Sequence, residues 1–188
     1  MAIELPGARE KLQKYVQRMG SRSREDFVAE VKVPILVQLT EPEGAEKKAD
    51  SAVPRFGTMS MNKENLVFAE AGIYVFPLRK QATNAFGMMV TVGRAANNDI
   101  VLPYDGISKF HAYFSNLGGA WVLVDAKSTN GTFIEGRRIN PDAKEKLDAS
   151  RPATEVSFSS SINCRLYSPA AFWDLMSQLM GCVKKKDE

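Results

Sequence analysis

The sequence is poor in the residues on which most catalytic and metal sites depend. Its 188 residues include one histidine and two cysteines, and the cysteines do not form a Cys-x-x-Cys pair. A single imidazole is too small a ligand set for a metal. Ser108, His111 and Asp99 can be named as a triad, but a serine and a histidine three residues apart in a turn are no catalytic signature. Gly-x-Ser-x-Gly, Walker-type and paired-histidine motifs are also absent, so we expect no enzyme, no metal and no cofactor.

Long apolar runs and long basic stripes are also missing. The longest apolar stretches, such as residues 34–37, are far too short to cross a bilayer, and the first residues lack a secretory-signal pattern. The formal net charge is +3, and the excess of basic over acidic residues falls between residues 72 and 167. This segment contains no long basic stripe interleaved with aromatic residues, which is the pattern of a nucleic-acid groove. We therefore expect neither a membrane nor a nucleic-acid partner. The two cysteines are expected to be free thiols, which favours the cytoplasm.

Residues 1–39 are predicted to form a helical N-terminal extension. Apolar residues between positions 12 and 19 recur at helical spacing, and Gly20 can end that helix. Ser23, with an acidic residue three positions later, can begin a second helix, and Pro34 stops the helical pattern. This pattern is typical of a helical hairpin packed on something larger, with a partner-docking surface as the alternative.

The rest of the chain divides into three parts. Residues 40–70 are predicted to be a partly structured linker, since residues 40–51 are rich in Glu, Lys, Pro, Gly and Ala while residues 53–70 show an ambiguous pattern. Residues 71–168 contain short β-forming runs separated by turn residues, which predicts an all-β sandwich or barrel. Residues 169–188 are predicted to be a C-terminal helix, ended by Gly181, and a solvated basic tail. The predicted strands are residues 73–78, 88–92, 100–102, 112–115, 121–124, 132–134, 156–158 and 163–167.

Three of the predicted turns hold side chains that suit an anion. A phosphate on a peptide offers acceptor oxygens and about two negative charges, so it favours a guanidinium or ammonium with neutral donors beside it. The side chains of this kind are Arg94, Ser108, Lys109, Thr129 and Asn130. Residue chemistry and spacing alone leave two interpretations, a phosphate site and ordinary turns between strands. Two aromatic residues near these turns, Phe110 and Trp121, are predicted to belong to the core.

The motifs around these residues resemble the forkhead-associated (FHA) domain family in residue type, order and spacing. The resemblance covers residues 70–168 and implies an eleven-stranded β-sandwich whose loops at one end bind phosphothreonine peptides. A hairpin pattern, Ile134-x-Gly136 followed by Ile139, extends it. The motifs that carry it are Gly93-Arg94 with Asn98-Asp99-Ile100, Ser108-x-x-His111, Trp121-x-Leu123-x-Asp125, and Ser128-Thr129-Asn130-Gly131-Thr132.

The resemblance also implies a role for each site residue. Arg94 and Ser108 match the family's main phosphate contacts, and Lys109 and Thr129 match further contacts to the same phosphate. Asn130 matches the residue that holds the peptide backbone beside the phosphothreonine. The residues that match loop-shaping positions, and are expected to support the site without binding, are Gly93, His111 and Gly131.

The expected function is therefore a phosphopeptide-binding module that recognises phosphothreonine on protein partners in Ser/Thr kinase signalling. A Ser/Thr protein kinase or its substrate is the candidate partner. The alternative is a structural or assembly adaptor whose helical extension makes phosphorylation-independent contacts. A further hypothesis concerns Thr40, at the head of the linker, which could occupy the chain's own site if a kinase phosphorylated it.

Overall fold

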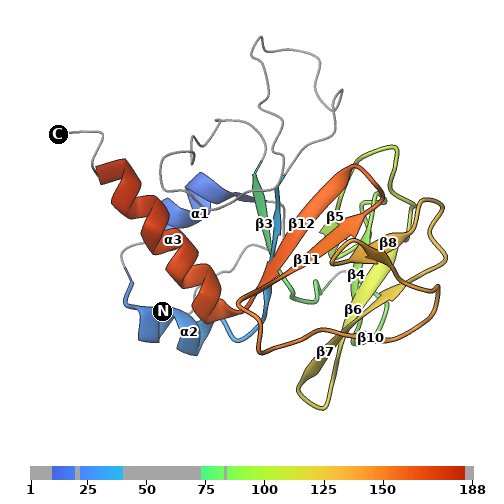
Figure 1. The fold of residues 1–188 in the computed structure, drawn as a ribbon, viewed down its shortest axis with the longest axis horizontal. Coiled ribbons are helices and arrows are strands. Elements are labelled where there is room, and N and C mark those ends of the chain that lie inside the picture. The colour runs from blue at the N-terminus through green and yellow to red at the C-terminus, as the bar shows by residue number, and fades with distance from the viewer. Residues whose placement is uncertain (1–9, 20–21, 40–72, 83, 185–188) are drawn as a thin grey trace, which may run out of the picture.

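Two β-sheets pack face to face, and three helices lie on one side of them (Figure 1). The computed structural model describes residues 10–19, 22–39, 73–82 and 84–184, with side chains described as far as residue 178. The predicted linker and Thr40 lie outside the described residues. None of the helices within the described ranges is long and apolar enough to span a bilayer.

Within these described ranges, the larger sheet has seven strands and the smaller sheet has five. Neighbouring strands run antiparallel in every pair but one, the parallel pair of residues 90–93 with residues 100–101. In spatial order, the larger sheet is β1 (Glu10–Lys11), β3 (Tyr74–Pro77), β2 (Ile35–Gln38), β12 (Ile162–Tyr167), β11 (Ala153–Phe158), β8 (Thr132–Ile134) and β9 (Arg137–Arg138). The smaller sheet is β10 (Glu145–Lys146), β7 (Ala120–Asp125), β6 (Ala112–Leu117), β4 (Val90–Gly93) and β5 (Ile100–Val101).

The predicted β-sandwich is confirmed, and each predicted strand has a counterpart in it. The described residues contain seven and five strands, one more in total than the eleven that the family resemblance implies. A first hydrophobic cluster, here called the sandwich core, fills the space between the sheets and contains side chains from both. Its buried members include Leu36, Phe76, Val92, Phe114, Leu123, Val156 and Phe158.

The strand β2 corrects the expectation that residues up to 39 belong to a helical extension. It lies in the middle of the larger sheet, between β3 and β12, with Leu36 paired to Phe76 and to Leu166. All four of its residues are buried. A strand covered on both faces shows an apolar run without alternation, so periodicity alone could not distinguish it from the end of a helix. Glu10 and Lys11 likewise pair with β3 instead of beginning the first helix.

The helices themselves form where the sequence predicts them. They are α1 (Leu12–Met19), α2 (Arg24–Glu30) and α3 (Pro169–Lys184). The side chain of Ser23 caps α2, because its Oγ accepts the N–H of Asp26 at 3.1 Å. The prediction that Gly181 ends the last helix is wrong, since α3 continues through it to Lys184.

A second hydrophobic cluster, here called the helix core, joins the three helices to the outer face of the larger sheet (Figure 1). The Tyr15 and Phe172 rings meet edge to face at 5.5 Å, and the Phe27 ring lies 5.3 Å from that of Trp173. The packed-hairpin interpretation is therefore the one that the described residues show. The other buried members of the helix core are Leu12, Met19, Val31, Ile35, Val37, Val75 and Met176.

Candidate functional site

The predicted site residues lie on three loops at strand ends. Arg94 follows β4, Ser108 and Lys109 stand between β5 and β6, and Thr129 and Asn130 stand between β7 and β8. The backbone joins the first two loops, because the N–H of Arg94 donates to the carbonyl oxygen of Ser108 at 3.0 Å. The three loops are separated in the sequence but lie at the same end of the smaller sheet.

The Ser108 side chain joins the second loop to the third. Its Oγ accepts the backbone N–H of Thr129 at 3.1 Å and donates to Thr129 Oγ1 at 3.4 Å. The neighbouring Asn130 donates from Nδ2 to the carbonyl oxygen of Gly106 at 2.9 Å. Two hydroxyls and an amide are thereby held at the exposed junction of the two loops, where a ligand with acceptor oxygens could replace the contacts between them.

The only histidine of the chain lies buried beneath this junction and bonds to both loops. His111 is fully buried, and its Nδ1 accepts the N–H of Ser108 at 3.1 Å. The proton therefore resides on Nε2, which donates to the carbonyl oxygen of Gly131 at 3.3 Å. Burial lowers the pKa of His111 from its ordinary value of 6.5, which keeps the ring neutral and this arrangement of donors intact. One imidazole thus links the loop of Ser108 to the loop of Gly131.

Gly93 permits the closest approach in the site. A Cβ at this position would overlap the carbonyl oxygen of Lys109, which is backbone and cannot move aside without shifting the loop. The same carbonyl oxygen accepts a hydrogen bond of 2.7 Å from Nδ2 of Asn98, a buried side chain. The first loop therefore packs closely on the second, because Gly93 has no side chain to hold them apart and the Asn98 amide bonds across them. Gly131 is required for another reason, its φ of +83°.

Asp125 supports the third loop, a role that the sequence analysis did not assign. Its buried carboxylate accepts the N–H of Ser128 at 3.0 Å, and hydrogen bonds of 2.6 Å from the hydroxyls of Ser128 and Thr132. The Ser128 hydroxyl oxygen also accepts the N–H of Gly131 at 3.0 Å. An Asp followed three residues later by a serine is a turn pattern, so the signal was present in the sequence.

The site carries two cations that are not neutralised within the described residues. Arg94 and Lys109 are exposed, and neither side chain forms an ion pair or hydrogen bond there. Most other exposed arginines differ in this respect, for example Arg137, which pairs with Glu145 at 2.9 Å. Two unpaired cations beside convergent hydroxyls match what a phosphate group requires.

Comparison with known proteins relates the segment that holds this arrangement to a known family. Residues 90–149, which contain every predicted site residue, match the family model for the FHA domain. This segment is similar to the FHA domain family. The resemblance expected from the motifs is confirmed for this segment, although the sandwich also includes β2, β3, β11 and β12, which lie outside the matched residues.

Two similar proteins match about a third of this chain or less. Over 51 residues, or 27% of this chain, it is 41% identical to the ABC transporter ATP-binding/permease protein Rv1747 of Mycobacterium tuberculosis, of which it covers 6%. Over 60 residues, or 32% of this chain, it is 35% identical to the FHA domain-containing protein FhaB of Mycolicibacterium smegmatis, of which it covers 39%. The chain thus spans well under half the length of either relative.

A solved structure that is similar to this chain is the FHA domain of yeast Dun1 in complex with a doubly phosphorylated peptide derived from Rad53. The similarity covers 72% of this chain and 73% of that one, with 20% identity and a TM-score of 0.44. The fold described above rests on the strand pairing of this chain and not on that likeness.

One expectation about the aromatic residues near the FHA loops is wrong. Trp121 packs against the sandwich core as predicted, but Phe110 belongs to neither hydrophobic cluster in the described residues. Its ring is half-buried and stacks on two other aromatic rings. The physical reason is that Phe110 lies in the bend before β6, which begins at Ala112, so strand alternation does not direct its ring into the core. The ring stacks on Phe86 and Tyr113 instead.

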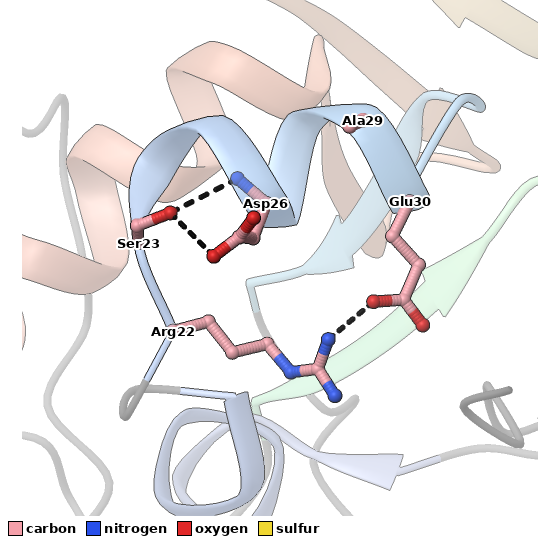
Figure 2. A pocket seen from close by; sticks show the side chains of 5 residues that line it. All are labelled: Arg22, Ser23, Asp26, Ala29 and Glu30. Carbon is pink, nitrogen blue, oxygen red and sulfur yellow. Dashed lines mark hydrogen bonds and ion pairs between the residues drawn. The ribbon is translucent and has the colours of Figure 1, made fainter. Parts of the chain in front are cut away.

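A hollow elsewhere on the molecule does not extend the candidate site. It is formed by α2 and the segment before it, and Figure 2 shows that its polar side chains satisfy one another. Ser23 bonds to Asp26, and Arg22 forms an ion pair with Glu30. No predicted site residue lines it. These contacts stabilise the helix and leave little for a ligand.

Proposed function

We propose that the chain is a phosphothreonine reader, which binds phosphorylated protein partners in Ser/Thr kinase signalling through the loops of its FHA domain. The observation that carries the proposal is the contact between Ser108 and Thr129, which brings two loops together beside two cations that have no ion pair among the described residues. Arg94 and Lys109 supply charge to the phosphate, and the two hydroxyls supply neutral hydrogen bonds. Asn130 holds the peptide backbone, and the preference for threonine over serine follows from the family resemblance.

The alternative function, a phosphorylation-independent adaptor, is not favoured by the packing of the helices. Its docking surface would be the apolar stripes of α1 and α2, but in the described residues those stripes lie in the helix core against α3, β2 and β3. A helix whose apolar face is already buried within its own chain has no such face for a partner helix.

The test is the removal of the main cation. In Arg94→Ala, binding of a degenerate phosphothreonine peptide library should weaken by about 30- to 150-fold, because a charge-assisted hydrogen-bond group worth about two to three kcal/mol is lost. Fluorescence anisotropy or calorimetry against the phosphorylated and unphosphorylated libraries measures it.

A matched control removes the same charge elsewhere. Arg24 is an exposed arginine that pairs with Asp174 between α2 and α3, so Arg24→Ala should bind as the parent does. Equal binding by Arg94→Ala and the parent, or equal binding of phosphorylated and unphosphorylated peptides by the parent, would contradict the proposed function.

A further inference from the structure

Three aromatic rings form a continuous strip beside the proposed phosphate site. The rings of Phe86 and Phe110 are nearly parallel, with centroids 5.3 Å apart and planes at 5°. Phe110 continues the stack to Tyr113, with centroids 6.2 Å apart and planes at 3°. We call Phe86, Phe110 and Tyr113 the aromatic strip. The strip lies outside both hydrophobic clusters of the described residues.

The exposed end of the strip is apolar to an unusual degree. Phe86 is 42% exposed and the nearby Met88 is 89% exposed. In the described part of the chain, the one other large apolar side chain of comparable exposure is Leu117, at 46%, near the end of β6. Two of the three therefore occur together beside stacked aromatic rings, which is the pattern of an interaction surface and not of scattered single residues.

The loop that presents Phe86 is anchored to a buried carboxylate. Asp99 accepts backbone hydrogen bonds from Gln81 at 2.7 Å and from Thr91 at 2.8 Å, and a side-chain hydrogen bond from Asn84 at 2.8 Å. The Oδ1 of Asn84 then accepts the N–H of Phe86 at 3.0 Å. The exposed ring is thus held in place by a chain of buried and partly buried hydrogen bonds, so a partner could bind it at small cost in loop ordering.

The strip is continuous with the phosphate site along the backbone. Its middle ring belongs to Phe110, which directly follows the cation Lys109 and directly precedes the supporting His111. A peptide residue advances about 3.3–3.6 Å when extended. Because Lys109 and Phe110 are consecutive in the chain, the residues that flank a phosphothreonine bound at Lys109 are the ones that we expect to meet the strip.

We infer that the aromatic strip, with Met88, is a specificity surface that binds a large apolar side chain of the same phosphorylated partner, within three residues of its phosphothreonine. This inference rests on the proposed function, and it adds the chemistry of the preferred sequence: a phosphothreonine with a Leu, Met or aromatic residue close by. The cations select the phosphate, while the strip selects among phosphorylated segments by burying apolar surface.

The experiment uses degenerate phosphothreonine peptide libraries in which one position at a time, from three before to three after the phosphothreonine, is fixed as Leu or as Ala. For the full chain, Leu should improve binding by about 5- to 15-fold at one or two adjacent positions, as expected for partial burial of one leucine side chain. The double variant Phe86→Ser with Met88→Ser should lose that preference and retain binding of the Ala libraries.

The matched control is Leu117→Ser, which removes an equally exposed apolar side chain from the far end of β6 and should keep the leucine preference. Met88→Ser alone should reduce it in part, and circular dichroism checks that each variant is folded. Equal binding of Leu and Ala libraries by the parent would overturn this inference while leaving the proposed function standing. If the parent binds none of the phosphothreonine libraries, this inference and the proposed function are both overturned.

A second copy of the chain is the other possible occupant. Sedimentation of the full chain without peptide should show no association that depends on Phe86 and Met88. A concentration-dependent dimer that the double variant abolishes would overturn the inference and make the strip a self-association surface.

Discussion

His111 shows how one side chain can organise a binding site without contacting a ligand. Its ring accepts a hydrogen bond from Ser108 on one side and donates one to Gly131 on the other, so it sets the spacing between the two loops that hold the hydroxyls. Protonation would place a second N–H opposite the Ser108 donor, and it would put a charge in a fully buried position. The neutral ring is therefore the form that keeps the loops together.

This predicts a pH dependence of stability. Because the pKa of His111 is lowered by burial, the unfolded chain binds the proton more readily than the folded chain. The contribution of His111 to the free energy of unfolding is thus complete above its ordinary pKa of 6.5 and is lost as the pH falls below it, by at most about 1.4 kcal/mol per pH unit. Chemical denaturation from about pH 7.5 to about pH 5.5 measures it.

His111→Asn is the matched variant for this measurement. The asparagine oxygen can accept the Ser108 N–H in place of Nδ1, and the amide does not titrate. The variant should lose less stability than the parent over the same pH range. Parallel profiles for the two proteins would exclude a role for the histidine proton.

At the scale of elements, β2 connects the two halves of the structure. Its residues alternate between the two faces of the larger sheet, with Leu36 in the sandwich core and with Ile35 and Val37 in the helix core. The strand precedes the segment that matches the FHA family and is separated from β3 by residues 39–73, yet it provides pairing partners for both β3 and β12. The sandwich therefore depends on residues that the motifs gave no reason to include.

Leu36→Ala tests the place of β2 in the sandwich. The substitution should lower the free energy of unfolding by about 2–5 kcal/mol, because it removes a fully buried side chain and leaves a cavity between the sheets. Leu117→Ala, at an exposed position, should change it by less than about 0.5 kcal/mol. Urea denaturation of both variants gives the comparison, and a Leu36→Ala protein as stable as the parent would show that β2 does not contribute to the core.

At the scale of the whole molecule, the described residues form two hydrophobic cores that share strands. Besides β2, the strand β3 contributes Phe76 to the sandwich core and Val75 to the helix core. Neither core can lose its packing without disturbing a strand on which the other depends. We therefore expect the helices and the sandwich to unfold together in one cooperative transition.

Phe172→Ala in α3 tests this coupling. It should lower the free energy of unfolding by about 3–5 kcal/mol, since Phe172 is fully buried and its ring meets those of Tyr15 and Phe27. Far-ultraviolet circular dichroism, which reports the helices, and the fluorescence of Trp121 in a Trp173→Phe background, which reports the sandwich, should still follow one curve. Two separate transitions would show that the helices form an independent unit.

The sequence by itself determined the parts of the structure that depend on local chemistry. The capped start of α2 at Ser23 and the strands with regular turns between them could be predicted, because each depends on neighbours a few positions away. The motif residues from Gly93 to Thr132 were identified by their resemblance to a family, and their role in binding stays a prediction. The strand β2, the aromatic strip and the support that Asp125 and Asp99 give to the loops were decided by tertiary structure. Each depends on contacts between segments that are distant in sequence. Whether a strand or ring is buried or exposed is decided by the segments that pack against it, and the local sequence pattern does not contain that information.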